Sequence, residues 1–303
     1  MAPMFLWAAP AGALELRESE RAIEVWSGGG KLLLRYHKQE SEVPEGISDV
    51  YRRSGYIHPL MTPDGRELTG DYAVDHAHQH GVFFAWTSGK YDGEKIDFWN
   101  QKKEEGRVEH RRVVSTLVKD QRVSFSVELS HFDQRDDDKE ILREVWTVTV
   151  RGLEGDRYQF DFESRQSIVG EEPLEIVKYH YGGMAVRGNA AWLGADACEF
   201  LTSETKSRVE GNHSKPDWVA MLGDLAGRPA AVVVMGHPDN FRAPQPVRIH
   251  PDKPYFCFAP MVEEGFMIEP GQEYRSRYRY LISGVELDRD WVDACWKEYA
   301  AGR

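Results

Sequence analysis

The segment Glu-Tyr-Arg-Ser-Arg-Tyr-Arg-Tyr-Leu-Ile, residues 273–282, decides the fold class because two kinds of side chain alternate along it. Arginines occupy one parity, and apolar side chains occupy the other, at Tyr274, Tyr278, Tyr280 and Ile282. A period of two is typical of a β-strand with one buried and one solvated face. Segments 123–129 and 158–163 alternate in the same way. The sequence therefore predicts antiparallel sheets.

Further strands follow from short apolar runs separated by turn residues. We expect them at Ile23–Trp26, Leu32–Tyr36, Val82–Trp86, Val108–Leu117, Leu142–Val150 and Ala230–Met235. One helix is expected at 288–300, where apolar residues recur at four-residue spacing and Asp288 or Asp290 can cap the first turn. The chain is predicted to be all-β, one large antiparallel β-sandwich over residues 1–303 with a short C-terminal helix. Its closing segment is similar to the last strands of galactose-mutarotase-like supersandwiches.

Charge and composition exclude several classes of function. The chain has 50 acidic and 38 basic residues, and its net charge of -12 repels nucleic acid. The three cysteines form no Cys-x-x-Cys pair, so a disulfide framework is not expected. No apolar run is long enough to cross a membrane. Residues 4–13 have the small-residue ending of an export signal but lack a basic start, so both a cytoplasmic and a periplasmic location stay open.

The segment Asp75-His76-Ala77-His78-Gln79-His80-Gly81 carries the strongest functional signal. If this segment is extended, its three imidazoles point to one face. Imidazole serves as a general acid or base near neutral pH and as a ligand of divalent metals. We therefore predict His76, His78, His80 and the distant His180 as catalytic residues. The first three are also the predicted ligands of a divalent metal ion, and the alternative is that they make structural hydrogen bonds.

Neighbouring segments combine aromatic, acidic and basic side chains, as sugar-binding pockets do. Lys178 and His180 share strand parity and are expected to line one wall. Loops 237–240 and 248–250 are expected to contact the pocket, and Glu263 and Glu264 are further acid or base candidates. The predicted substrate-binding residues are His58, Asp75, Trp86, Trp99, Lys178, Arg187, His237 and Arg248.

Several of these motifs occur together in a known bacterial family. They are His58-Pro59-Leu60, the histidine segment, Phe84-Ala85-Trp86, Asp97-Phe98-Trp99, Gly106-Arg107-Val108-Glu109-His110, Gly182-Gly183-Met184 and His237-Pro238-Asp239-Asn240. In this pattern the chain resembles, over roughly residues 20–285, the family labelled "methane oxygenase PmoA". That family commonly has adjacent histidines followed by arginine where this chain has His78-Gln79-His80-Gly81. The resemblance implies a role in sugar metabolism.

Three functions remain open at this stage. The first is a carbohydrate-active enzyme, meaning a hydrolase, lyase or epimerase, that acts on a small-molecule or oligosaccharide ligand. The second is a sugar-binding sandwich without catalytic activity, and the third is a metal-dependent oxygenase. The enzyme requires the histidines to converge with His180 or a carboxylate in one concave pocket. A binding module would instead present an exposed aromatic platform.

Overall fold

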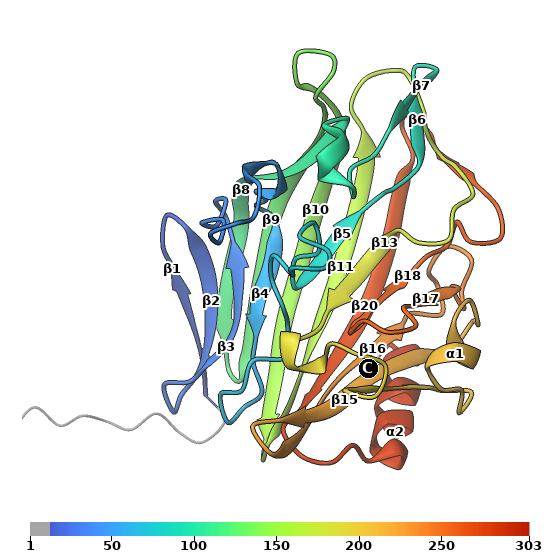
Figure 1. The fold of residues 1–303 in the computed structure, drawn as a ribbon. Coiled ribbons are helices and arrows are strands. Elements are labelled where there is room, and N and C mark those ends of the chain that lie inside the picture. Colours follow the sequence, from blue (N-terminus) through green and yellow to red (C-terminus); the bar gives the residue numbers. More distant parts are fainter. Residues whose placement is uncertain (1–12, 303) are drawn as a thin grey trace, which may run out of the picture.

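The computed structural model describes residues 13–302, and two large sheets dominate it (Figure 1). The first sheet has the order β1 (Leu14–Glu18), β2 (Ala22–Ser27), β3 (Leu32–His37), β4 (Tyr56–Leu60), β5 (Val82–Ala85), β13 (Gly183–Arg187), β18 (Tyr255–Phe258) and β17 (Val247–Ile249). Every neighbouring pair in it is antiparallel.

The second sheet also has eight strands, and all neighbours in it are antiparallel. Its order is β14 (Glu199–Thr202), β15 (Trp218–Leu225), β16 (Arg228–Gly236), β20 (Glu273–Ser283), β11 (Arg157–Ile168), β10 (Lys139–Glu154), β9 (Arg122–Asp133) and β8 (Gly106–Lys119). A small third sheet joins β19 (Phe266–Ile268), β12 (Leu174–Ile176), β6 (Gly89–Tyr91) and β7 (Glu94–Ile96).

The alternating residues 273–282 form a strand whose tyrosines are buried, as the sequence predicts. Tyr278 pairs with Phe162 and Tyr280 pairs with Phe160 across strands β20 and β11, and both tyrosines are buried. The rings of Phe160 and Tyr280 stack with centroids 4.4 Å apart. Apolar side chains from both large sheets form one continuous core, and burying such surface is the main favourable term in folding. The prediction of a large antiparallel β-sandwich is confirmed.

Helices are few and short in the described chain. Helix α2 (Arg289–Ala300) begins where the sequence predicts, and the Asp288 side chain accepts hydrogen bonds from the backbone of Asp290 and Trp291. Its apolar stripe covers the outer face of β15, β16 and β20, where Val292 and Tyr299 are buried. The other helical turns are α1 (Arg208–Gly211) and the 3-10 turns Asp49–Tyr51, Gln101–Lys103 and Ala190–Trp192.

One of the segments considered in the sequence lies near the start of the chain. Residues 4–13, which have the small-residue ending of an export signal, fall almost wholly outside the described residues. Within residues 13–302, no helix combines the length and apolar character needed to cross a membrane.

Candidate functional site

Strands β5, β13, β18 and β17 lie side by side in the first sheet, and the chain around them encloses a pocket of about 180 Å³. We call it the histidine pocket. Its lining residues come from four separate parts of the chain, and they are His76, His78, Gln79, Trp99, Asn100, His180, Tyr181, Arg248, His250 and Tyr255. None of these lining residues is a carboxylate.

The histidine segment folds as two consecutive tight turns, so it is not extended and the condition for three aligned imidazoles is not met. The backbone N–H of His76 bonds the carbonyl of Ala73 at 2.9 Å, and that of Gln79 bonds the carbonyl of His76 at 2.9 Å. Gly81 ends the segment with a φ of 46°, and a Cβ there would lie 2.1 Å from the carbonyl oxygen of Ile57. Only glycine fits this close approach.

The turns separate the three histidines instead of aligning them. The rings of His76 and His78 lie 5.3 Å apart, and His250 lies 5.8 Å from His76. His80 is fully buried and outside the lining of the pocket. Its Nδ1 lies 2.6 Å from Asp71, and its Nε2 lies 3.2 Å from the Gln101 side chain. His80 therefore anchors the base of the loop.

Asp75 and Arg187, both predicted to bind substrate, instead lie behind His76. The Arg187 guanidinium is buried and donates two hydrogen bonds to the Asp75 carboxylate, at 2.7 and 3.0 Å. Asp75 in turn lies 3.1 Å from Nδ1 of His76. Despite partial burial, hydrogen bonds from Arg187 and His76 hold the pKa of Asp75 far below its usual range. An ionised Asp75 accepts the Nδ1 proton, which leaves Nε2 as the basic nitrogen of His76.

Burial favours the uncharged form of the pocket's imidazoles. It lowers the pKa of His78 and of His250 to about 4, and it also lowers the pKa of His76 and His180. A neutral imidazole is a base. Arg248 supplies a cation to the lining, and its guanidinium donates to the side chain of Asn212 at 3.0 Å.

Aromatic side chains form another wall of the pocket. Trp99 and Tyr255 are buried with ring centroids 5.9 Å apart, and Tyr181 lies 5.3 Å from Trp99. The Tyr181 hydroxyl lies 3.1 Å from Nδ2 of Asn100. Burial raises the pKa of Tyr181 to about 12, so this phenol stays protonated at neutral pH and can donate a proton.

Four other residues predicted for the site do not line the histidine pocket. His58 bonds the Thr69 hydroxyl at 3.0 Å behind the loop. Trp86 is buried between the sheets, where its indole donates to Gln166 at 2.6 Å. Lys178 is exposed in an irregular loop, so strand parity does not join it to His180. His237 lines different pockets beside helix α2.

Sequence reasoning missed four lining residues, Gln79, Asn100, Tyr181 and Tyr255. Asn100 directly follows the Asp97-Phe98-Trp99 motif, and this position could have identified it as a site residue. Asp97 accepts from the backbone and the side chain of Asn100, both at 2.8 Å, and so orients the amide. For Tyr255 the local sequence holds no comparable signal, because only the pairing of β18 with β13 brings it to the pocket.

The three predicted metal ligands do not form a ligand set, because His80 bonds Asp71 below the loop. Across residues 13–302, no three His, Cys, Asp or Glu side chains are arranged to hold a metal ion. The described donors thus do not supply the three or more protein ligands of a zinc site.

Comparison with protein families matches residues 23–297 to a family described as one of unknown function, DUF6807. The chain belongs to the DUF6807 family. This description carries no methane-oxygenase label. No curated protein matches the DUF6807 chain.

Solved structures give only distant similarity to this DUF6807 protein. Heparan sulfate lyase HepC from Pedobacter heparinus aligns with 95% of the chain at 9% identity and a TM-score of 0.40. A heparinase III with methylated lysines aligns with 89% at 9% identity and a TM-score of 0.32. A TPR-domain-containing protein from Parabacteroides distasonis aligns with 91% at 9% identity and a TM-score of 0.25. The chain spans 38%, 30% and 48% of these proteins, and similarity at this level establishes no shared activity.

Proposed function

We propose that the histidine pocket binds a sugar unit carrying a carboxylate and moves the proton on the carbon next to that carboxylate, as a uronate lyase or epimerase does. The observation that carries this proposal is the chemistry of the lining: four imidazoles, a guanidinium and two phenols, without a carboxylate. Such a set can remove a proton and can stabilise an anion.

His76 is the proposed base. Its Nδ1 proton is held by Asp75, and the bidentate bond from Arg187 fixes Asp75. This chain of contacts sets the ring orientation and leaves Nε2 to accept the substrate proton. Asp75 and Arg187 are positioning residues here, since neither lines the pocket.

Arg248 is the proposed partner of the substrate carboxylate. Removing a proton next to a carboxylate places negative charge on its oxygens, and a guanidinium can donate two hydrogen bonds to them. Asn212 accepts from Arg248 at 3.0 Å and thereby restricts the guanidinium. The Asn100 amide, oriented by Asp97, donates to the Tyr181 hydroxyl at 3.1 Å and so positions this phenol beside the substrate.

Tyr181 is the proposed acid. In elimination, Nε2 of His76 takes the C5 proton, and the electron pair left on C5 forms the C4–C5 double bond as the C4–O bond breaks. The electron pair of the C4–O bond leaves on the oxygen, which takes the Tyr181 proton. In epimerisation, C5 instead receives a proton on the opposite face. The Tyr181 hydroxyl, which lies 3.1 Å from the Asn100 amide, is the proposed proton donor in both reactions.

Hydrolysis of glycosides is less compatible with this lining, because most glycosidases use a pair of carboxylates. The sequence candidates Glu263 and Glu264 are exposed, and they pair with Lys215 and Arg242 outside the pocket. A binding module is also less compatible, since Trp99 and Tyr255 are buried in the wall and form no exposed platform.

The test is incubation of the protein with uronate-containing oligosaccharides in deuterated water. Elimination is read from the ultraviolet absorbance of the unsaturated product, and epimerisation is read from deuterium at C5. We expect His76→Gln to reduce the rate by about 10²–10⁴-fold with an unchanged melting temperature. His110→Gln is the matched control, because His110 bonds Tyr36 at 3.0 Å away from the pocket. Saturable binding with neither product would contradict the enzymatic proposal and favour the binding module.

A further inference from the structure

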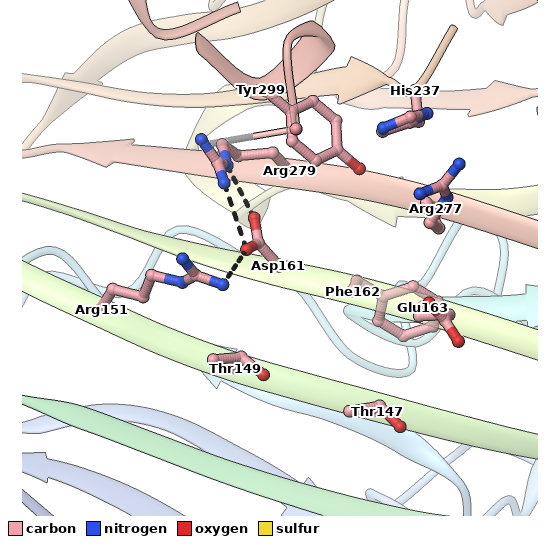
Figure 2. A pocket seen from close by; sticks show the side chains of 11 residues that line it. Thr147, Thr149, Arg151, Asp161, Phe162, Glu163, His237, Arg277, Arg279 and Tyr299 are labelled. Atoms are coloured by element: carbon pink, nitrogen blue, oxygen red, sulfur yellow. Dashed lines mark hydrogen bonds and ion pairs between the residues drawn. The ribbon is translucent and has the colours of Figure 1, made fainter. Parts of the chain in front are cut away.

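We propose that a second pocket, on the outer face of the second sheet, binds an anionic sugar unit. This arginine pocket has a volume of about 290 Å³ and lies beside the end of helix α2 (Figure 2). It shares no residue with the histidine pocket, so the proposal does not depend on the proposed function. The side chains that line it come from β10, β11, β20, α2 and the turn at His237.

One carboxylate serves two guanidiniums at the wall of the arginine pocket. Asp161 accepts from Arg279 at 2.6 and 3.2 Å, and it lies 2.8 Å from Arg151 (Figure 2). Arg279 is almost buried, whereas Arg151 is about a third exposed. Arg151 can therefore turn part of its donor fork toward a ligand while Asp161 stays paired with Arg279.

A second carboxylate nearby also pairs with two guanidiniums. Glu163 accepts from Arg275 at 2.6 Å and lies 3.3 Å from Arg165. Arg277 pairs with Asp239 at 2.7 Å. The described lining of the arginine pocket holds three guanidiniums, of Arg151, Arg277 and Arg279, and two carboxylates, of Asp161 and Glu163. These lining groups carry a net charge of +1 on a chain whose total is -12, which favours an anion at this place.

The ion pair between Arg277 and Asp239 is the one in which a ligand can take the place of the carboxylate. Asp239 has 72% of its side chain exposed, and exposed ion pairs contribute little to stability. A ligand oxyanion can thus replace Asp239 on Arg277 at little cost. His237 lies next to Arg277 in the pocket (Figure 2), and its Nδ1 accepts from the backbone N–H of Asp239 at 3.1 Å. The neutral ring then carries its proton on Nε2 and can donate to the same anion.

Hydroxyl groups make the pocket suitable for a sugar. Thr147 and Thr149 bond Ser126 and Ser124 at 2.9 and 3.0 Å. Each threonine hydroxyl has one donor and two acceptor positions, so one such bond leaves capacity for a ligand hydroxyl. Small-molecule pockets measure roughly 300–1,000 Å³, so this one suits a single ring. The charge on that ring can be a carboxylate or a sulfate, since guanidinium recognises both.

The experiment is calorimetric titration at constant ionic strength with glucuronate, glucose 6-sulfate and glucose. We expect at least one anionic sugar to bind saturably and glucose to bind much more weakly. Which of the two anions binds tells whether the natural charge is a carboxylate or a sulfate. Arg277→Gln and Arg151→Gln should each weaken that binding about tenfold or more, since each removes a charge-assisted hydrogen bond.

The matched control is Arg143→Gln, which removes the same charge from β10 outside the pocket, where Arg143 pairs with Glu140. It should bind like the unchanged protein. His76→Gln separates the two pockets, because only binding in the histidine pocket should respond to it. Four results would overturn the proposal: no saturable binding, equal binding of glucose, an equal loss in Arg143→Gln, or a loss confined to His76→Gln. Melting temperatures of both test variants check that they fold.

Discussion

Glu144 lies in the core with no exposed side-chain surface, and its carboxylate is fully bonded. It lies 2.8 Å from Nε2 of the equally buried His131 and accepts from Ser164 and Gln166 at 2.5 and 2.9 Å. These partners outweigh the cost of burial and hold the pKa of Glu144 below its usual value. Buried charge is tolerated only with such pairing.

Glu144→Gln should therefore lower the free energy of unfolding by about 3 kcal/mol, because it replaces a buried carboxylate that is bonded to His131, Ser164 and Gln166 with an amide that cannot accept every bond. Urea unfolding measures this change. Glu204→Gln is the control: its exposed pair with Lys206 should be worth about 0–1 kcal/mol. Equal effects of the two substitutions would mean that the buried pair has no special role in stability.

At the scale of single elements, strands and the C-terminal helix were predictable, and the histidine loop was not. Alternation in residues 273–282 is a local property, and burial of one face follows from it directly. The histidine segment alternates as well, yet it forms turns because Gly81 must approach Ile57 in the neighbouring strand β4. That contact depends on tertiary structure, which the spacing of the histidines does not contain.

The N-terminal cap of helix α2 can be tested by substitution. The Asp288 carboxylate accepts from two backbone N–H groups of the first turn, at 3.0 and 3.3 Å. Asp288→Ala should lower the free energy of unfolding by about 1 kcal/mol because it leaves these donors without a partner in the protein. Asp288→Asn keeps a capping oxygen and should be close to neutral. Chemical denaturation of both variants checks the expectation, and an equal loss in both would point to charge instead of capping.

At the scale of the whole molecule, the histidine pocket was only partly predictable. The residue types were visible in the sequence, but the pocket joins residues 76–79, 99–100, 180–181 and 248–255. They meet because β13 pairs with both β5 and β18, strands far apart in the chain. Long-range packing fixes this strand pairing, and the local sequence does not show it. Trp86 and Lys178 were therefore predicted from their residue types alone, and they do not line the pocket.

The buried histidines also make the stability of the whole molecule depend on pH. Burial lowers the pKa of His58 and His78 from 6.5 to about 4. As pH falls below 6.5, the unfolded chain takes up protons that the folded chain does not, so folding becomes less favourable. The contribution is zero well above pH 6.5 and reaches its full unfavourable value only below the folded pKa of about 4.

We therefore expect the free energy of unfolding to fall between pH 6.5 and 4.5, a window above the range in which most carboxylates titrate. Each such histidine costs at most about 1.4 kcal/mol per pH unit within it. Urea unfolding at a series of pH values measures the slope. His78→Gln removes one of these groups and should flatten the slope, whereas Lys90→Gln on the exposed β6 surface should not. A flat profile for the unchanged protein would mean that these imidazoles take up protons in the folded state, and the pocket would then contain cations instead of neutral bases.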